Sequence, residues 1–173
     1  TYDIRVQRSL HVATLISLAY IFYPATKNSP QDKPTYLDLF LAFLAFVPFF
    51  YITLIYESLI VHTTLTAPIT LTELTLGTIA LIMILEAARR VAGLAFAAIG
   101  AAILSYPLLG PYMPGLLAHR GFTWPQVVDL LYLGVEGIFG IPIHVSFAYI
   151  FPLIVFSAFL SATGSAQFFN DLS

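Results

Sequence analysis

Long apolar runs separated by short polar stretches dominate this chain. The runs lie at residues 10–25, 36–61, 71–88, 91–110 and 139–163. A membrane-spanning helix needs about 20 mostly apolar residues, and these runs reach or approach that length. The first run is the shortest, but the long side chains of Arg5 and Arg8 before it can extend to the membrane surface. The pattern therefore predicts five transmembrane helices.

The boundary between the third and fourth runs allows two interpretations. Only Arg89 and Arg90 interrupt the apolar pattern there, with no turn residue between the runs. Segment 71–106 is thus either a hairpin of two helices or one continuous helix, about 54 Å long at 1.5 Å per residue. Because a bilayer core is only about 30 Å thick, we favour a break or a strong tilt near Arg89. Thr70 followed by Glu73 fits a capping box, which predicts where the third helix begins.

The segment before the last run has a different composition. Residues 111–126 are rich in proline and glycine, and their aromatic residues suit the headgroup layer of a membrane. From Pro125 onward the pattern is that of an amphipathic helix, with Gln126, Asp129 and Glu136 as polar positions among apolar ones. We therefore expect an interfacial loop followed by one shallow amphipathic helix.

The composition indicates a membrane protein. The 173 residues are 59% hydrophobic and only 9% charged, with a mean hydropathy of +0.89, whereas soluble domains carry about 25% charged residues. We predict an all-α polytopic integral membrane helical bundle, with about five transmembrane helices and one interfacial amphipathic helix. The net charge of −2 without a basic block argues against nucleic-acid binding. The absence of cysteine excludes disulfides and thiolate metal sites.

Residues that carry chemistry in enzymes do not cluster in this sequence. It contains no phosphate-binding loop, no zinc-protease motif and no nucleophile-elbow motif. The histidines at positions 11, 62, 119 and 144 fall in different segments, so we expect neither a metal site nor a cofactor. The sequence therefore predicts a protein that is not an enzyme.

One group of charged residues has the spacing of a helical ion pair. Glu86 is followed by Arg89 and Arg90, and side chains three or four positions apart meet on one face of a helix. We expect Glu86 to pair with one of these arginines, which would fix a helix end or bind an anionic lipid. Glu86, Arg89 and Arg90 are therefore assigned as a structural ion pair.

The stretch GVEGIFGIP, residues 134–142, stands at the entry to the last run. Its glycines recur every three residues, which on a helix would form a smooth stripe for close packing. Glycine and proline also permit an interrupted helix, whose backbone dipoles would face an ion or a substrate. We favour helix packing as the role of the glycines. For Glu136 we favour a position at a helix N-terminus in the membrane interface. The weak candidates for substrate or ion binding are Glu136, Gly137, Gly140, Pro142 and His144.

Several longer stretches carry a family resemblance: GPYMPGLLAHRGF, LYLGVEGIFGIP and SATGSAQFFNDL, with LEAARRVAG and VQRSLHVA upstream. They resemble the fused permease of tripartite ATP-independent periplasmic (TRAP) transporters, in the branch that works with TAXI-type receptors. The resemblance implies a small-subunit-like membrane module at 1–110, an interfacial loop and amphipathic connector helix at 111–136, and the start of the large transport module at 137–173. It also implies a longer polypeptide, with its ion and substrate sites beyond Ser173.

The same resemblance implies a function. A TRAP-type secondary transporter imports organic acids (carboxylates) and is driven by a gradient of sodium ions or protons. The implied partners are an extracytoplasmic TAXI-type solute-binding protein, the remaining transport module of the same polypeptide and the lipid bilayer. The implied location is the prokaryotic cytoplasmic (inner) membrane. The alternative is a structural scaffold domain, which packs and orients the moving part without a transport role of its own.

Overall fold

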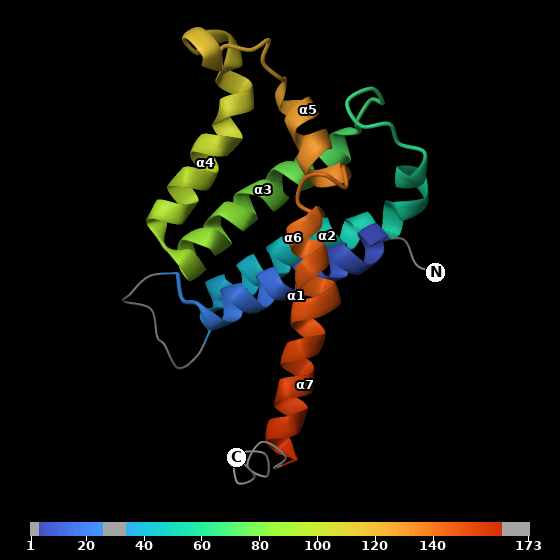
Figure 1. Ribbon diagram of the computed structural model, residues 1–173, viewed down its shortest axis with the longest axis vertical. Helices are drawn as coiled ribbons and strands as arrows, with labels where there is room; N and C mark the ends of the chain where they lie inside the picture. Colours follow the sequence, from blue (N-terminus) through green and yellow to red (C-terminus); the bar gives the residue numbers. More distant parts are fainter. Residues whose placement is uncertain (1–3, 26–33, 164–173) are drawn as a thin grey trace.

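A computed structural model describes residues 4–25 and 34–163 of the chain (Figure 1). Within these ranges every regular element is helical. In chain order the elements are α1 (Ile4–Phe22), α2 (Tyr36–Ile60), α3 (Leu71–Ala92), α4 (Leu94–Leu109), η1 (Gly110–Tyr112), η2 (Gly115–Leu117), α5 (Trp124–Val128), η3 (Asp129–Leu133), α6 (Ile141–Val145), η4 (Ser146–Ile150) and α7 (Phe151–Ala162). The elements η1 and η2 are 3-10 helices, whereas η3 and η4 are π-helical. Most of the stretch SATGSAQFFNDL, and with it residues 164–173 of the expected large-module start, lies outside the described residues.

Among the described residues, four helical segments are long and apolar enough to cross a membrane, by length and composition: Tyr36–Ile60, Leu71–Ala92, Leu94–Tyr112 and Ile141–Ala162. The predicted class, an all-α polytopic membrane protein, is confirmed at this level. The first expected span does form a helix, α1, but this helix is not among the four. Its N-terminal half contains two arginines and other polar residues, which lower its hydropathy.

The first three helices form the core of the molecule. α1 and α2 run side by side in opposite directions, and α3 packs against both (Figure 1). Ala13, Ala45 and Ala80 are fully buried, and such small side chains let helix backbones approach closely. Phe49 of α2 and Tyr132 of η3 are buried in the same cluster, so the chain after α4 returns to this core.

The chain breaks between α3 and α4 at Gly93. Its φ of 95° and ψ of 170° belong to a backbone region that is essentially restricted to glycine. The Gly93 N–H donates to the carbonyl of Arg89 over 3.1 Å, which closes the last turn of α3 before the chain changes direction. The break expected near Arg89 is confirmed, and segment 71–106 forms two helices. The predicted capping box also forms, because Thr70 and Glu73 each accept the backbone N–H of the other.

The chain after α4 first folds back on that helix. The Phe122 N–H donates to the carbonyl of Pro107 over 2.9 Å, and the Tyr106 hydroxyl donates to the carbonyl of Leu117 over 3.1 Å. α5 begins at Trp124, whose indole N–H donates to the Thr78 hydroxyl of α3 over 2.9 Å. These bonds fix the direction in which α5 approaches α3.

The short helix of α5 and η3 differs from the shallow amphipathic helix that we expected. It packs against α3, and its residues Val128 and Tyr132 are fully buried. Asp129, which the pattern places among the polar positions, is only 2% exposed. A carboxylate enters the core here because polar groups of a distant loop bind it, as described below.

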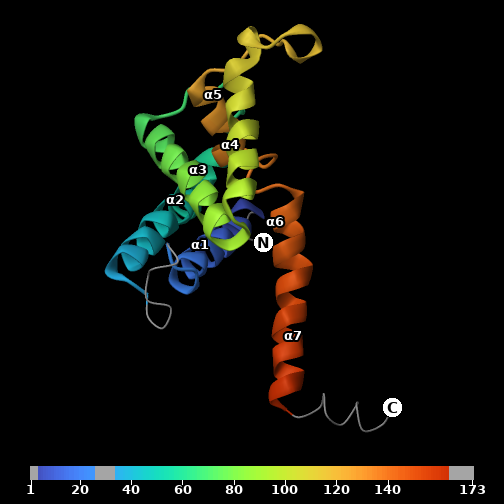
Figure 2. The same cartoon turned by 90° about the vertical axis from the view of Figure 1, so that its left-hand side faces the viewer.

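After a turn at residues 134–140 comes the span Ile141–Ala162. Its first half contacts α1, and its far end stands away from the other helices (Figure 2). We call this span, which comprises α6, η4 and α7, the outer helix. None of its residues is buried. Large apolar side chains such as Ile154 and Phe159 are exposed along it. Its surface is therefore left for lipid or for another protein segment to cover.

Candidate functional site

A hollow lies where the first turns of α1 meet the turn before the outer helix. Its volume is about 580 Å³, and it is lined by Ile4, Arg5, Arg8, Val135, Glu136, Gly140, Ile141 and Pro142. We call it the arginine hollow. It brings together three of the weak candidate residues, namely Glu136, Gly140 and Pro142. The arginines come from α1, and nothing in the sequence pattern had linked them to this stretch.

Both arginines of the hollow also bind backbone carbonyls. Arg5 Nη1 donates to the carbonyl of Leu59 near the end of α2, and Arg8 Nη1 donates to the carbonyl of Phe139. Phe139 is fully buried, with its ring edge-on to Phe49 at a centroid distance of 6.2 Å. Arg8 therefore links α1 to the turn that leads into the outer helix.

The glycines of this stretch lie in a turn, so the expectation of a glycine stripe on a helix is wrong. Gly137 packs closely, but against the chain just before it: a Cβ there would lie 2.4 Å from the Cα of Leu131. The next residue fixes this contact, because the Ile138 N–H donates to the carbonyl of Leu131 over 2.9 Å. Side-chain periodicity predicted a helix here, whereas the tight approach to Leu131 requires a turn with glycine at its contact point.

Gly140 has a more open environment than Gly137. A Cβ on it would lie 3.0 Å from the carbonyl oxygen of Gly137, and its φ of −71° is ordinary for any residue. The helical backbone is interrupted between η3 and α6. This agrees with the alternative given for residues 134–142, an interrupted helix. Gly140 is the residue before the first turn of the outer helix, and its carbonyl accepts the N–H of His144 over 3.1 Å.

His144 and Gly137 do not line the arginine hollow. The His144 ring lies edge-on to Tyr149 at 6.2 Å, on the outer helix itself. A different histidine connects the outer helix to the bundle: Nε2 of His11 lies 3.0 Å from Oγ of Ser146. The His11 ring also contacts Phe147 edge-on, at 5.6 Å.

The predicted ion pair at the end of α3 is confirmed. Glu86 accepts hydrogen bonds from Arg89 at 2.7 Å and from Arg90 at 2.9 Å. Arg90 also pairs with Asp38 of α2 at 2.7 Å, and these two side chains are 1% and 4% exposed. The Arg90 guanidinium lies 4.6 Å from the ring centre of Tyr20 in α1. This cluster therefore ties the ends of three helices together, and Asp38 and Tyr20 are the members that the sequence pattern did not indicate.

A second buried polar contact, between His62 and Asp129, was also not predicted. Nε2 of His62 lies 2.7 Å from the Asp129 carboxylate, and the Leu65 N–H donates to the same carboxylate over 2.6 Å. Leu65 has a positive φ of 67°, which is uncommon for a residue with a branched side chain. The contact thus holds the loop after α2 in an unusual conformation. The one feature of the sequence that could have indicated this contact is Asp129 itself, a lone aspartate among the apolar residues of α5 and η3.

Tyr132 completes the polar contacts of this region. Its hydroxyl donates to the carbonyl of Pro48 over 2.6 Å, and both residues are fully buried. Burial raises the pKa of Tyr132, so its phenol remains a neutral donor. The aspartate and the tyrosine of η3 therefore anchor this segment to the loop after α2 and to α2 itself.

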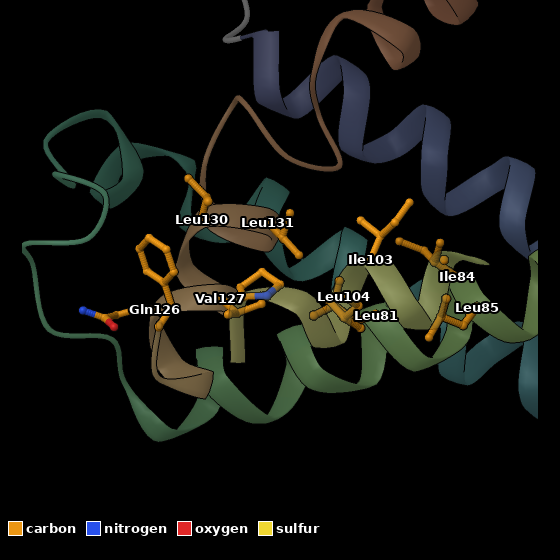
Figure 3. A pocket seen from close by; sticks show the side chains of 12 residues that line it. Leu81, Ile84, Leu85, Ile103, Leu104, Gln126, Val127, Leu130 and Leu131 are labelled. Carbon is orange, nitrogen blue, oxygen red and sulfur yellow. The ribbon is translucent and has the colours of Figure 1, made fainter. Parts of the chain in front are cut away.

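An apolar cavity of about 330 Å³ lies between α3, α4 and α5 (Figure 3). Leucine and isoleucine side chains of α3, α4 and η3 surround it, among them Leu81, Ile103 and Leu130, and α5 adds Val127. Figure 3 shows Gln126 at one end, with its amide turned away from the leucines. The side-chain oxygen Oε1 of Gln126 already accepts the backbone N–H of Thr123 over 2.9 Å. The cavity therefore suits hydrocarbon and offers no group for acid–base or metal chemistry.

Within residues 4–25 and 34–163, no three histidine, aspartate or glutamate side chains come together as a metal site requires. In comparisons with known proteins, the chain matches no family model, no curated protein and no solved structure. The argument for function therefore rests on the sequence stretches quoted above and on the arrangement of the helices.

Proposed function

We propose that this chain is the membrane component of a TRAP-type secondary transporter that imports organic acids. In this proposal a gradient of sodium ions or protons drives uptake, and an extracytoplasmic TAXI-type solute-binding protein delivers the carboxylate substrate. The membrane is the prokaryotic cytoplasmic membrane. The stretches that resemble the fused permeases support this assignment.

The observation that carries the proposal is the exposure of the outer helix, which contacts α1 but shares no buried core with the other helices. The bundle of α1, α2, α3 and α5 buries a common core, whereas Ile141–Ala162 has no buried residue. A helix that is apolar on all sides needs cover from lipid or from other helices. A small module followed by the first helix of a larger transport module would have this arrangement, and the turn at 134–140 lies at the expected joint.

Two polar contacts hold the joint. Arg8 donates to the carbonyl of Phe139, and His11 contacts the hydroxyl of Ser146. Both residues belong to α1, so this helix would hold the first helix of a transport module in a fixed position relative to the bundle.

A scaffold without a transport role is the second candidate. It is favoured by the polar groups of the described bundle, many of which bind one another, as Arg90 binds Asp38 and Glu86. The apolar cavity likewise lacks a group that would recognise a carboxylate. Under this alternative the bundle only orients the helices that move.

Uptake into proteoliposomes tests the proposal. The chain is reconstituted alone and within the full-length polypeptide, each with a TAXI-type receptor, a panel of carboxylates and a sodium or proton gradient. We expect accumulation that depends on both receptor and gradient for the full-length polypeptide, and none for residues 1–173 alone. Accumulation by the chain alone would contradict the proposed division into modules. A full-length polypeptide that accumulates no carboxylate with any receptor would contradict the TRAP assignment.

A further inference from the structure

A histidine side chain holds the loop that follows α4 against the end of that helix. We call residues 113–122 the return loop, because they fold back on α4 (Figure 1). The backbone N–H of His119 donates to the carbonyl of Gly110 over 3.2 Å, and its ring covers this glycine so closely that a Cβ there would lie 2.2 Å from Cε1. The ring also contacts Tyr106 of α4, at a centroid distance of 4.8 Å. The imidazole therefore fills the space between the return loop and the helix.

The hydrogen bonds of this ring define its protonation state. Nδ1 of His119 accepts the backbone N–H of Gly121 over 3.0 Å. A ring nitrogen that accepts a hydrogen bond carries no proton, so the imidazole is neutral and its proton is on Nε2. Nε2 is enclosed and has no hydrogen-bond partner among the described residues. The closed return loop therefore holds the neutral form of the histidine.

A second proton on the ring would break this arrangement. Both nitrogens of imidazolium carry protons, so Nδ1 would become a donor that faces the N–H of Gly121. Nε2 would still have no acceptor. A charged group that is enclosed without hydrogen-bond acceptors is costly, so the imidazolium favours a conformation in which water reaches it.

Within the described residues, no carboxylate lies within 4.0 Å of this ring to stabilise a positive charge. The segments around it, residues 94–128, contain no aspartate, glutamate or lysine at all. Their titratable and charged groups besides His119 are Tyr106, Tyr112 and Arg120. Arg120 would repel an imidazolium beside it. A cation near a helix C-terminus is usually favourable, but the carbonyls of Pro107 and Gly110 already accept backbone N–H groups of the return loop.

We propose that His119 is a pH-sensitive switch: the return loop is closed on α4 while the imidazole is neutral, and it opens when the ring takes up a proton. Histidine side chains change charge between about pH 8 and pH 5. The open loop binds one more proton than the closed loop, so the ratio of open to closed loop rises as the pH falls, by up to about tenfold per pH unit. Opening also frees the carbonyls of Pro107 and Gly110 at the end of α4. The inference is independent of the transport proposal, because it concerns this loop alone.

Distance measurements between two spin labels test the proposal. The sequence contains no cysteine, so A98C on α4 and A118C in the return loop, both at exposed positions, can be labelled specifically. The full chain is measured in detergent by pulsed electron paramagnetic resonance, in steps from about pH 8 to about pH 5. We expect one short distance at the upper end of this range and a growing population of longer distances as the pH falls.

Two variants identify the group that titrates. H119N keeps an acceptor oxygen near the position of Nδ1 but takes up no proton in this range, so its distances should not change with pH. H144N removes a histidine outside the return loop, whose ring contacts Tyr149 instead, and it should keep the full pH response.

Distances that stay constant with pH in the labelled chain would overturn the proposal. So would a pH response that persists in H119N, or one that H144N abolishes. If H119N does not fold, NMR of the imidazole nitrogens decides without a variant: a proton on Nδ1 of His119 while the spin labels remain at the short distance would also overturn the proposal.

Discussion

His62 and Asp129 lie 67 positions apart in the chain, yet Nε2 of the histidine is 2.7 Å from the carboxylate of the aspartate. The other carboxylate oxygen accepts the Leu65 N–H, so one buried side chain fixes both the start and the middle of the loop after α2. Asp129 is also the first residue of η3. The pair therefore joins η3 to the loop after α2.

Replacing Asp129 tests how much this pair stabilises the fold. D129A leaves the His62 ring and the Leu65 N–H without their acceptor, so we expect the free energy of unfolding to fall by about 1–3 kcal/mol. D129N should cost less, because its amide oxygen still accepts one hydrogen bond. Thermal melts in detergent measure the difference, with E57Q, at an exposed carboxylate, as the control. A D129A melt equal to that of E57Q would contradict this account.

The two arginines at the end of α3 should differ in their effect on stability. Arg90 is 1% exposed and binds two carboxylates, so R90A leaves Asp38 buried without its cation and should cost about 3–5 kcal/mol. The Arg89 side chain is 36% exposed, and R89A should cost less than about 1 kcal/mol. The same melts rank the two variants. Equal losses would mean that the Asp38–Arg90 contact adds nothing beyond the Glu86 pairs.

Contacts between near neighbours in sequence were predictable, and contacts between distant segments were not. The pairing of Glu86 with Arg89 and Arg90 follows from helical spacing alone, as does the capping of Thr70 by Glu73. The bonds from Arg90 to Asp38 and from His62 to Asp129 depend on how helices pack, which one sequence does not specify. For this reason the arginine hollow was only half predicted: its residues 136–142 were singled out, whereas its α1 residues were not.

The spacing of the glycines wrongly predicted a helix at residues 134–140. At the break between α3 and α4, the sequence analysis did not consider Gly93. Glycines three apart fit a helical face, but the same spacing serves a turn that rests on the backbone of Leu131. Between α3 and α4 we predicted the break from Arg89 and Arg90, whereas Gly93 is the residue at which the helix ends. In both places the deciding property was backbone conformation, which a pattern of apolar and polar residues does not record.

Gly93 offers a test of backbone strain without crowding. A Cβ at this position would have no heavy atom within 4 Å, so space is not the constraint. Its φ of 95° with ψ of 170° is nevertheless costly for any residue with a side chain, by about 1–3 kcal/mol. We expect G93A to lower the melting temperature and G100A, inside α4, to change it less. A neutral G93A would show that the hairpin adjusts its backbone freely.

The turn before the outer helix should be sensitive to substitution at Gly137 and tolerant at Gly140. G137A places a methyl group 2.4 Å from the Leu131 backbone, which cannot move without shifting η3, so we expect a loss of about 1–3 kcal/mol. G140A meets its nearest atom at 3.0 Å and needs no unusual φ, so its cost should stay below about 1 kcal/mol. Melts of both variants measure stability, and under the proposed transport function receptor-dependent uptake by the full-length polypeptide measures transport. If the turn only connects modules, uptake should fall in proportion to the folded fraction. A stable G140A protein without uptake would instead show that the interrupted backbone itself takes part in transport.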